Sequence, residues 1–386
     1  MHPANGRTRA GAANMGMTYQ TEGEFSQLLQ RFRVLSPRSR MIEIGSLGGE
    51  TLRHWIDNVG SGSRIVSVDL RVPESDDRHA SHREGQEVLW PQWAAAAGVE
   101  LTVLNADSTR PETFARVRGL VPSVDFLFID GGHDYATVRS DAIRYSSLVR
   151  PGGLVALHDV QGIPDVARFW NEVKGAGCGE EICMPGGWGI GLLPGGLRQQ
   201  LTIITPCSRP GNLSRLLAGV ELCRELLDVR WLIVHDGPVP EADFPAWVTQ
   251  KSHRAPDSVA GKAQINVALE GIEGGWVWVL DDDNDVHPGF SSILLDMIAE
   301  HPAAKAFVFP QVCGAAVRPV GPRLIRECSI DQAQYVVRRD FIGSRRYPLR
   351  YTADGAFVEE LFSAEPGSFR FSPTPAVYYN ALAATA

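Results

Sequence analysis

The stretch Val124–Asp159, VDFLFIDGGHDYATVRSDAIRYSSLVRPGGLVALHD, reads as strand, site, helix, turn, strand and site. Its first residues form a short apolar run rich in aromatic and β-branched side chains, which is typical of a strand buried on both faces of a parallel sheet. Apolar side chains from Tyr135 to Ile143 then recur at helical spacing. An RPGG turn at 150–153 ends this helix, and a second apolar run follows it. The stretch therefore predicts a βαβ unit of an α/β protein.

Each of these two runs ends in polar side chains. Asp130 and His133 follow the first run, and His158 and Asp159 follow the second. Ligands of open α/β sheets bind beyond the carboxyl ends of the strands. Two acids and two histidines arriving at one edge therefore predict a site. The alternative is that the two aspartates only cap the turns that follow them.

Length and composition limit the classes of protein that fit. The chain has 386 residues, of which 44% are hydrophobic and 21% charged, so it has room for two globular domains. A formal charge of −8 without a basic tract argues against nucleic acid as the main partner. No apolar run approaches the ~20 residues that span a bilayer. Residues 1–23 lack an apolar signal core and are predicted to be a disordered leader. We expect a cytoplasmic protein with no transmembrane segment, and a homo-oligomer is compatible with this composition.

Three further strands are predicted before the central stretch, at 40–44, 64–68 and 99–104. A glycine turn, GSLGG, follows the first of them, and such a turn lets the backbone approach a ligand and aims helix N–H groups at it. The second strand ends at Asp69, roughly 20 residues on, where an acid can accept hydrogen bonds from ribose hydroxyls. The third ends in Asn105-Ala106-Asp107-Ser108.

This order of strands, glycine turn and acids resembles the class I S-adenosylmethionine-dependent methyltransferases, over about residues 24–196. The resemblance implies a Rossmann-like fold with S-adenosylmethionine as the cofactor. It assigns the methionine part of the cofactor to Glu43, Gly45, Ser46 and Gly48, the ribose to Asp69, the adenine to Asp107 and Ser108, and a further cofactor contact to Asp130. A nucleotide-binding dehydrogenase is the alternative, and the absence of GxGxxG counts against it.

The sequence IDGGHDY followed by HD resembles, more narrowly, metal-dependent O-methyltransferases acting on sugars of natural products, and the related cephalosporin-hydroxylase group. The resemblance implies that Asp130 and Asp159 hold Mg²⁺ and that His133 is the general base. Carboxylate oxygens suit a hard divalent cation, and a histidine of near-neutral pKa can take a hydroxyl proton. His158 departs from these relatives, which often carry another acid there. Alternatively, His133 only caps a turn. The polar segment 71–87, which follows the second strand, is predicted to be a solvated lid over the cofactor or a separate metal cluster.

A second α/β pattern begins at Leu201. Strands are predicted at 201–205, 229–235 and 276–280, with helices over 213–227 and 262–269. The third strand runs into Asp281-Asp282-Asp283-Asn284-Asp285. Four carboxylates in five residues are costly to crowd together without a cation. The alternative is a helix cap or a group of solvated acids.

This half resembles the family 2 glycosyltransferases of the GT-A fold, over about residues 200–386. The resemblance implies a nucleotide-sugar donor and a DxD motif in VLDDDN, where Asp281 and Asp283 hold Mg²⁺ or Mn²⁺. It implies that Asp354, before a short helix, is the catalytic base. The donor-binding residues that it implies are Thr205, Arg209, Asp236, Lys262, Asn266, Asp281 and Asp282.

The two halves together predict a bifunctional enzyme that modifies a glycan or another glycosylated acceptor. A Rossmann-like methyltransferase domain (24–196) is followed, after a short linker, by a GT-A domain (200–386). The alternative is a scaffold or carbohydrate-binding protein with one or both domains inactive. Crowded acids at both predicted sites argue against that alternative.

Overall fold

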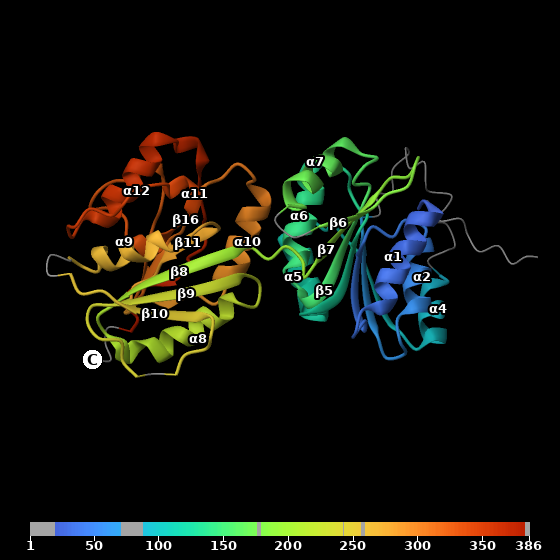
Figure 1. The fold of residues 1–386 in the computed structure, drawn as a ribbon, viewed down its shortest axis with the longest axis horizontal. Coiled ribbons are helices and arrows are strands. Elements are labelled where there is room, and N and C mark those ends of the chain that lie inside the picture. Colours follow the sequence, from blue (N-terminus) through green and yellow to red (C-terminus); the bar gives the residue numbers. More distant parts are fainter. Residues whose placement is uncertain (1–19, 71–87, 176–178, 242, 256–258, 383–386) are drawn as a thin grey trace, which may run out of the picture. The chain divides into compact units, whose positions relative to one another are not determined.

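The computed structural model describes residues 20–70, 88–175, 179–241, 243–255 and 259–382 (Figure 1). Most of the predicted leader and the polar segment 71–87 lie outside these residues. The chain divides into two compact units, which are 1–108 with 124–133 and 153–193, and 109–123 with 134–152 and 194–386. This division differs from the predicted domain ranges, because it assigns the helices at 111–120 and 135–146 to the second unit.

The first sheet has seven strands in the order β3-β2-β1-β4-β5-β7-β6. Their bounds are β1 Arg40–Ile44, β2 Arg64–Asp69, β3 Glu100–Asn105, β4 Val124–Ile129, β5 Val149–His158, β6 Glu180–Ile182 and β7 Ile190–Pro194. β1 runs parallel to both β2 and β4, and β6 is antiparallel to β7. The strand order reverses between β1 and β4, which is where ligands bind in open α/β sheets.

The helices of the N-terminal half are α1 Glu22–Val34, α2 Glu50–Asn58, α4 Trp90–Ala97, α5 Pro111–Leu120, α6 Tyr135–Ser146 and α7 Pro164–Val173. Helix α1 begins at Glu22, so the predicted leader does not extend to residue 23. Helices α4 and α5 and strand β6 were not predicted from the sequence. Strand β5 begins before the RPGG turn rather than after it.

An aromatic core joins α1 and α2 to one face of the first sheet. Helices α1, α2 and α4 lie on the same side of strands β1 to β3 (Figure 1). The Trp55 ring is 5.3 Å from the Phe32 ring and 5.2 Å from the Phe126 ring, and all three side chains are buried. Burying side chains of this size contributes about 1.5–3 kcal/mol each. The core therefore fixes the strands whose carboxyl ends carry the predicted site.

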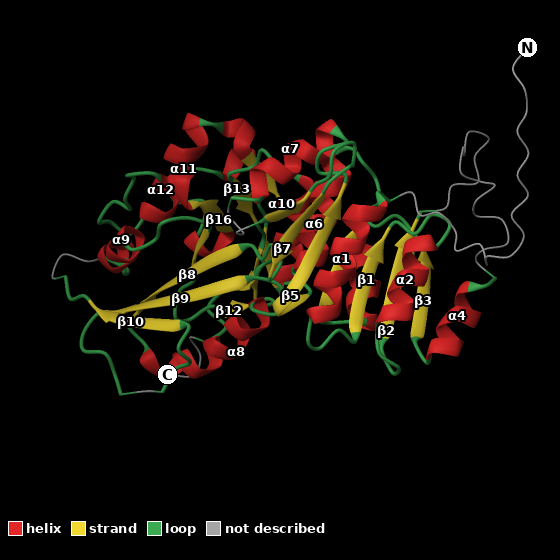
Figure 2. Cartoon of the chain, turned by 45° about the vertical axis from the view of Figure 1, so that its right-hand side comes forward, coloured by secondary structure: helices red, strands yellow, loops and turns green. Residues whose placement is uncertain are grey.

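The second sheet also has seven strands, in the order β10-β9-β8-β11-β16-β13-β17 (Figure 2). Its strands are β8 Gln200–Cys207, β9 Asp228–His235, β10 Val248–Ser252, β11 Trp276–Val279, β13 Ala306–Val308, β16 Tyr335–Arg338 and β17 Phe369–Phe371. β8 is parallel to β9 and β11, whereas β16 is antiparallel to β11 and β13. The strand order reverses between β8 and β11, so this sheet has a switch point of its own.

A small third sheet and the remaining helices complete the second unit. The sheet is formed by β12 Asp285–Val286, β18 Val377–Tyr378, β14 Gln311–Cys313 and β15 Ala316–Arg318. The helices are α8 Leu213–Cys223, α9 Lys262–Glu270, α10 Phe290–Glu300, α11 Arg339–Ile342 and α12 Ala353–Ala364, with 3-10 turns η1 Pro210–Asn212, η2 Pro322–Leu324, η3 Gln332–Gln334 and η4 Pro366–Ser368.

The predicted α/β class is confirmed, and one element of the second half is corrected. Asp354 does not precede a short helix, because it lies in the first turn of the twelve-residue helix α12. The strands after β11 have only two to four residues each, too few to show a period in the sequence. None of the helices within the described residues is long and apolar enough to cross a bilayer.

A matched pair of glycine substitutions tests the close approach of the glycine turn to β4. Gly45 has a φ of +87°, and a Cβ there would lie 2.1 Å from the Asp130 carbonyl oxygen. Gly62 has a φ of +81° but nothing within 4 Å. Gly62→Ala should cost only the left-handed backbone penalty, about 1–2 kcal/mol. Gly45→Ala should cost about 1–3 kcal/mol more because of the overlap. Urea denaturation measures both, and equal losses would contradict the close approach.

Candidate functional site

The glycine turn after β1 is organised by Asp69. The backbone N–H groups of Ser46 and Leu47 both donate to Asp69 Oδ2, at 3.0 and 2.8 Å. Asp69 is the last residue of β2, so one carboxylate ties the second strand to the turn after the first. Within the described residues, no hydrogen bond engages Asp69 Oδ1. The turn and the predicted ribose acid therefore form one unit, with an acceptor oxygen still available.

Glu43 lies behind this turn rather than in it. Its side chain is fully buried and accepts hydrogen bonds from Thr51 and Trp55 of α2 and from Ser67 of β2. Burial raises the pKa of Glu43 to about 8 despite these hydrogen bonds. Glu43 is therefore mostly a neutral acid at pH 7 that fastens α2 to the sheet. Its observed hydrogen bonds all go to α2 and β2, and they do not support the predicted contact with the methionine part of the cofactor.

The other predicted cofactor residues stay near this edge. Gly48 lies in the turn before α2, and a Cβ there would meet the Glu50 carboxylate. The side chain of Ser46 is buried and hydrogen-bonds Ser67. Asp107 and Ser108 follow β3 directly, and both are partly exposed.

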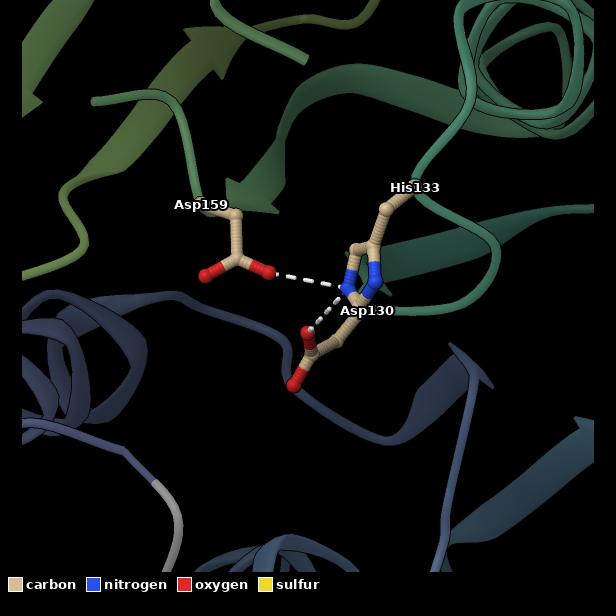
Figure 3. A group of neighbouring side chains, drawn as sticks. All are labelled: Asp130, His133 and Asp159. Carbon is tan, nitrogen blue, oxygen red and sulfur yellow. Dashed lines mark ion pairs between the residues drawn. The ribbon is translucent and has the colours of Figure 1, made fainter. Parts of the chain in front are cut away.

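The two acids and two histidines of the central stretch meet in one cluster. Asp130 follows β4, His158 ends β5, Asp159 follows it, and His133 lies between β4 and α6. His133 Nε2 is 2.8 Å from Asp159 Oδ2 and 4.0 Å from Asp130 Oδ1 (Figure 3). His158 Nδ1 lies 3.0 Å from Asp130 Oδ1 and 3.0 Å from Asp159 Oδ1. The two carboxylates are thus bridged twice by imidazole rings.

This bridging shifts the proton affinities of all four groups. The ion pairs with Asp130 and Asp159 raise the pKa of His133 to about 9, the nearer contact being the hydrogen bond to Asp159. Burial alone would lower the pKa of His158, but its bonds to the two carboxylates outweigh burial and raise it to about 10. Burial would raise the pKa of Asp159, yet the two histidines hold it at about 2. The pKa of Asp130 is lowered too, because the histidines outweigh its burial.

The cluster is therefore two carboxylates balanced by two imidazolium groups when no cation is bound. The expectation that His133 has a near-neutral pKa is not met in this state, because both carboxylates hold its proton. His158 supplies half of the balancing charge. Its buried Nε2 has no hydrogen-bond partner within the described residues.

Asp159 also has an unusual backbone conformation. Its φ is +65°, in the left-handed region that non-glycine residues rarely adopt. Conformations of this kind cost on the order of 1–3 kcal/mol and persist where the surroundings fix them. Hydrogen bonds from Val160 N to Gly189 O and from Ile163 N to Asp159 O hold the chain here. The observed strain favours a functional role for Asp159 over that of a simple turn cap.

The donor set suits a divalent cation. Asp130, His133 and Asp159 offer three ligand atoms that lie within 4.8 Å of one another, and no other group of three among the described residues meets this criterion. The two carboxylates are ligands that Mg²⁺ or Mn²⁺ prefers, whereas the imidazole of His133 suits such hard cations less well. A cation and the imidazole protons would compete for the same oxygens, so binding should release protons.

In the second unit, most residues of the predicted donor site line a single cavity of about 860 Å³. It lies at the carboxyl ends of β8, β9 and β11 and is also lined by residues of η3 and α12. Of the predicted residues, the cavity is lined by Arg209, Asp236, Lys262, Asp281, Asp282, Asp283 and Asp354. These positions are spread over 146 residues of sequence, from 209 to 354, and the fold brings them together.

Two predicted donor residues do not reach this cavity. Thr205 is fully buried and accepts a hydrogen bond from Trp231 Nε1 at 2.9 Å. Asn266 pairs with the backbone of Tyr347, accepting from its N–H and donating to its carbonyl. Neither side chain lines the cavity. Both are corrected to structural roles, because their polar atoms satisfy buried partners within the fold.

Asp282 anchors the turn after β8. Its Oδ2 accepts from the backbone N–H groups of Ser208 and Arg209, each at 2.6 Å, and its Oδ1 accepts from Arg209 Nε at 2.9 Å. The side chain is almost wholly buried. With both oxygens engaged inside the protein, Asp282 serves the turn instead of the predicted donor contact.

The acids in the cavity are partly balanced by bases. Arg209 bridges Asp282 and Asp283, each 2.7 Å from its Nη2, and the buried Lys262 ammonium pairs with Asp354. The sequence suggested that a cation is needed to hold the crowded acids together. The structure shows that Arg209 and Lys262 also balance their charge. Burial raises the pKa of Asp354, and burial with the nearby Asp331 raises that of Asp281 well above its ordinary value. Gln332 Nε2 donates to Asp281 Oδ1 at 2.5 Å.

Comparisons with known proteins agree with the N-terminal part of this description. Residues 42–160 match the family model described as "Methyltransferase domain". This segment is therefore similar to a methyltransferase domain, and it contains Glu43, Asp69, Asp130, His133 and Asp159. No curated protein matches the chain.

Similar solved structures include CalS11, a calicheamicin methyltransferase, at 16% identity, covering 44% of this chain and 77% of that one, with a TM-score of 0.35. They also include an O-methyltransferase from Bacillus cereus in complex with SAH, at 18% identity, with coverages of 47% and 83% and a TM-score of 0.34. MycE methyltransferase from the mycinamycin pathway, in complex with Mg and SAH, matches at 24% identity and a TM-score of 0.26. The match covers 35% of this chain and about a third of MycE, 32%.

The histidine pKa values predict how stability depends on pH without a divalent cation. Histidines whose pKa is raised in the folded state stabilise it fully below their unfolded value, near 6.5. That contribution is lost as the pH rises through about 9 for His133 and about 10 for His158. The Asp159 contribution is present above its unfolded value, near 4, and is lost as the pH falls through about 2.

Urea denaturation in EDTA from pH 6 to 10 should therefore show stability falling with pH, and His158→Asn should flatten the fall. The control is His54→Asn in α2, because burial lowers the pKa of His54 and its removal should not flatten the curve. An unchanged slope in His158→Asn would contradict the bridged cluster.

Proposed function

We propose that the N-terminal domain is an S-adenosylmethionine-dependent O-methyltransferase acting on a hydroxyl group of a sugar. The observation that carries this proposal is the joint placement of two features at the carboxyl edge of the first sheet. One is the glycine turn tied to Asp69, and the other is the cluster of Asp130, His133 and Asp159. The match of residues 42–160 to a methyltransferase domain supports the first feature. The sugar class rests on the resemblance of IDGGHDY and HD to sugar O-methyltransferases.

The roles of the residues follow from the geometry. The N–H groups of Ser46 and Leu47 are held by Asp69 Oδ2, which fixes the shape of the glycine turn, and Asp69 Oδ1 can accept from ribose hydroxyls. Asp130 and Asp159 would hold a divalent cation, which would lower the pKa of a hydroxyl bound beside it. His133 is half-exposed and adjoins both acids, so it is placed to take the hydroxyl proton. His158 is buried against the same carboxylates and orients them.

Cation binding and proton transfer by His133 depend on each other. The carboxylate oxygens that would hold the cation are those that now hold the proton on His133. When these oxygens are taken by a cation, the pKa of His133 loses the attraction that raises it to about 9. The same imidazole would then be a base at neutral pH, as general base catalysis requires.

Cofactor binding tests this proposal directly. Calorimetry should detect S-adenosylhomocysteine binding that Asp69→Ala weakens by about 1–3 kcal/mol, because buried hydrogen-bonding groups lose their acceptor. Asp57→Ala is the matched control, since Asp57 is an exposed acid of α2 that pairs with Arg53. Equal or tighter binding of NAD by the wild-type protein would favour the dehydrogenase alternative and contradict the proposal.

We also propose, as a second function, nucleotide-sugar-dependent glycosyl transfer by the second unit, which comprises the predicted GT-A domain. The observation that favours it is the cavity that gathers Asp236, Lys262, Asp281, Asp283 and Asp354 at the switch point of the second sheet. Asp236 would contact the nucleotide, Asp281 and Asp283 a cation on the diphosphate, and Asp354 the acceptor hydroxyl. Lys262 and Arg209 place positive charge at the same edge.

Donor binding in this cavity should depend on a divalent cation. The cavity is lined by six aspartates against two arginines and one lysine, so an added diphosphate would meet an excess of negative charge. Mn²⁺ should therefore tighten binding of UDP-, GDP- or dTDP-linked sugars in calorimetry, and EDTA should abolish it. Asp283→Asn should remove the Mn²⁺ dependence.

Asp340→Asn is the matched control, because Asp340 is an exposed acid of the same unit paired with Arg338. Neither substitution should alter S-adenosylhomocysteine binding. Equal donor binding in Mn²⁺ and in EDTA would contradict the cation role of Asp281 and Asp283.

A further inference from the structure

The segment that leads into α1 contacts the cluster of acids and histidines directly. Gln20 precedes α1, is mostly buried, and donates from Nε2 to Asp130 Oδ2 at 2.6 Å. The other oxygen of Asp130, Oδ1, is the one that faces His158 and His133. Gln20 therefore fixes the rotation of the Asp130 carboxylate and determines which oxygen faces the cluster.

The first turn of α1 contacts the loop at 184–189. The Glu24 side chain is fully buried and accepts three backbone hydrogen bonds from the loop at 184–189. Met184 N donates to Oε1 at 2.8 Å, and Trp188 N and Gly189 N donate to Oε2 at 3.2 and 3.1 Å. A Cβ at Gly187 would lie 2.2 Å from Glu24 Oε1, so the loop needs glycine to pack this closely. The Glu24 carboxylate thus fixes both ends of this loop through three backbone hydrogen bonds.

This loop in turn holds the chain after Asp159. Val160 N donates to Gly189 O at 3.2 Å, and the N–H groups of Gln161 and Gly162 donate to Trp188 O at 2.8 and 3.0 Å. These residues follow Asp159, whose φ of +65° has to be maintained by its neighbours. Glu24 therefore acts on Asp159 through two consecutive sets of hydrogen bonds.

We infer that Gln20 and Glu24 are positioning residues for the cation site, Gln20 acting on Asp130 and Glu24 on Asp159. This inference rests on the proposed cation-dependent methyl transfer and assigns it two residues outside the strand ends. Partners that hydrogen-bond the ligands of a metal orient them, and their loss typically lowers metal affinity about 10–100-fold. Both residues come from the short segment 20–24, so this segment sets the spacing of two acids that follow different strands.

The test is Mn²⁺ affinity, measured by calorimetry and by electron paramagnetic resonance on the full chain. Gln20→Leu removes the donor to Asp130, and we expect Mn²⁺ binding weaker by about 10–100-fold. In Glu24→Gln, the amide NH₂ would face backbone donors, and we expect a loss of roughly tenfold. The matched controls are Gln27→Leu and Glu22→Gln, exposed positions of the same helix, which should bind Mn²⁺ like the wild type.

S-adenosylhomocysteine affinity separates positioning from loss of the fold. It should be unchanged in all four variants, because the glycine turn and Asp69 contact neither Gln20 nor Glu24 through any hydrogen bond seen among the described residues. If the wild type binds Mn²⁺ and Gln20→Leu and Glu24→Gln bind it equally well, the inference is overturned while the cation proposal stands. If the wild type binds no Mn²⁺ at the first site, the cation proposal fails and the inference fails with it. The wild type and all four variants are compared with Asp283→Asn added to each. This substitution removes cation binding by the cavity of the second unit, so that only Mn²⁺ binding at Asp130 and Asp159 is measured.

Discussion

Carboxylates that are brought together at the ends of neighbouring strands need positive charge beside them. Asp130 and Asp159 follow β4 and β5, and their side chains would repel each other if nothing lay between them. Two imidazoles fill that place, with contacts of 2.8 to 3.0 Å from His133 and His158. The imidazoles hold the two carboxylates close together when no cation is bound. A cation that binds these carboxylates would have to displace the imidazole protons. The pKa values of His133 and Asp159 and the stability of this edge follow from that single constraint.

The second unit meets the same constraint with different groups. Its acids follow β11, and the balancing charges are a guanidinium and an ammonium, Arg209 and Lys262. The Arg209 guanidinium keeps its charge over the physiological pH range, unlike imidazole. The two proposed sites should therefore respond differently to pH. Cation binding at the first should release protons, whereas donor binding at the second should depend mainly on the cation.

Both sheets place their sites where the strand order reverses, and a glycine or proline turn lets the chain leave the strand there. At the first switch point, Gly45 passes so close to Asp130 that a side chain would not fit. At the second, the turn after β8 is tied to Asp282. In each case one aspartate accepts two backbone N–H groups of the turn, the half-buried Asp69 in the first sheet and the buried Asp282 in the second. Neighbouring acids are thereby left for ligands.

The sequence by itself determined the strands β1 to β5, β8, β9 and β11, their carboxyl-terminal acids and the two glycine- or proline-containing turns, because these features have a short period and are local. Asp69, Asp130, His133 and Asp159 were found in this way. Roles that depend on which polar atom a distant side chain reaches were decided only by the tertiary structure. Gln20 bonds a residue 110 positions away, and nothing in its neighbourhood marks it. Asp282 and Asp283 are adjacent in sequence, yet burial makes the first an anchor of the turn and leaves the second beside the cavity. Such differences depend on packing, which no local pattern encodes.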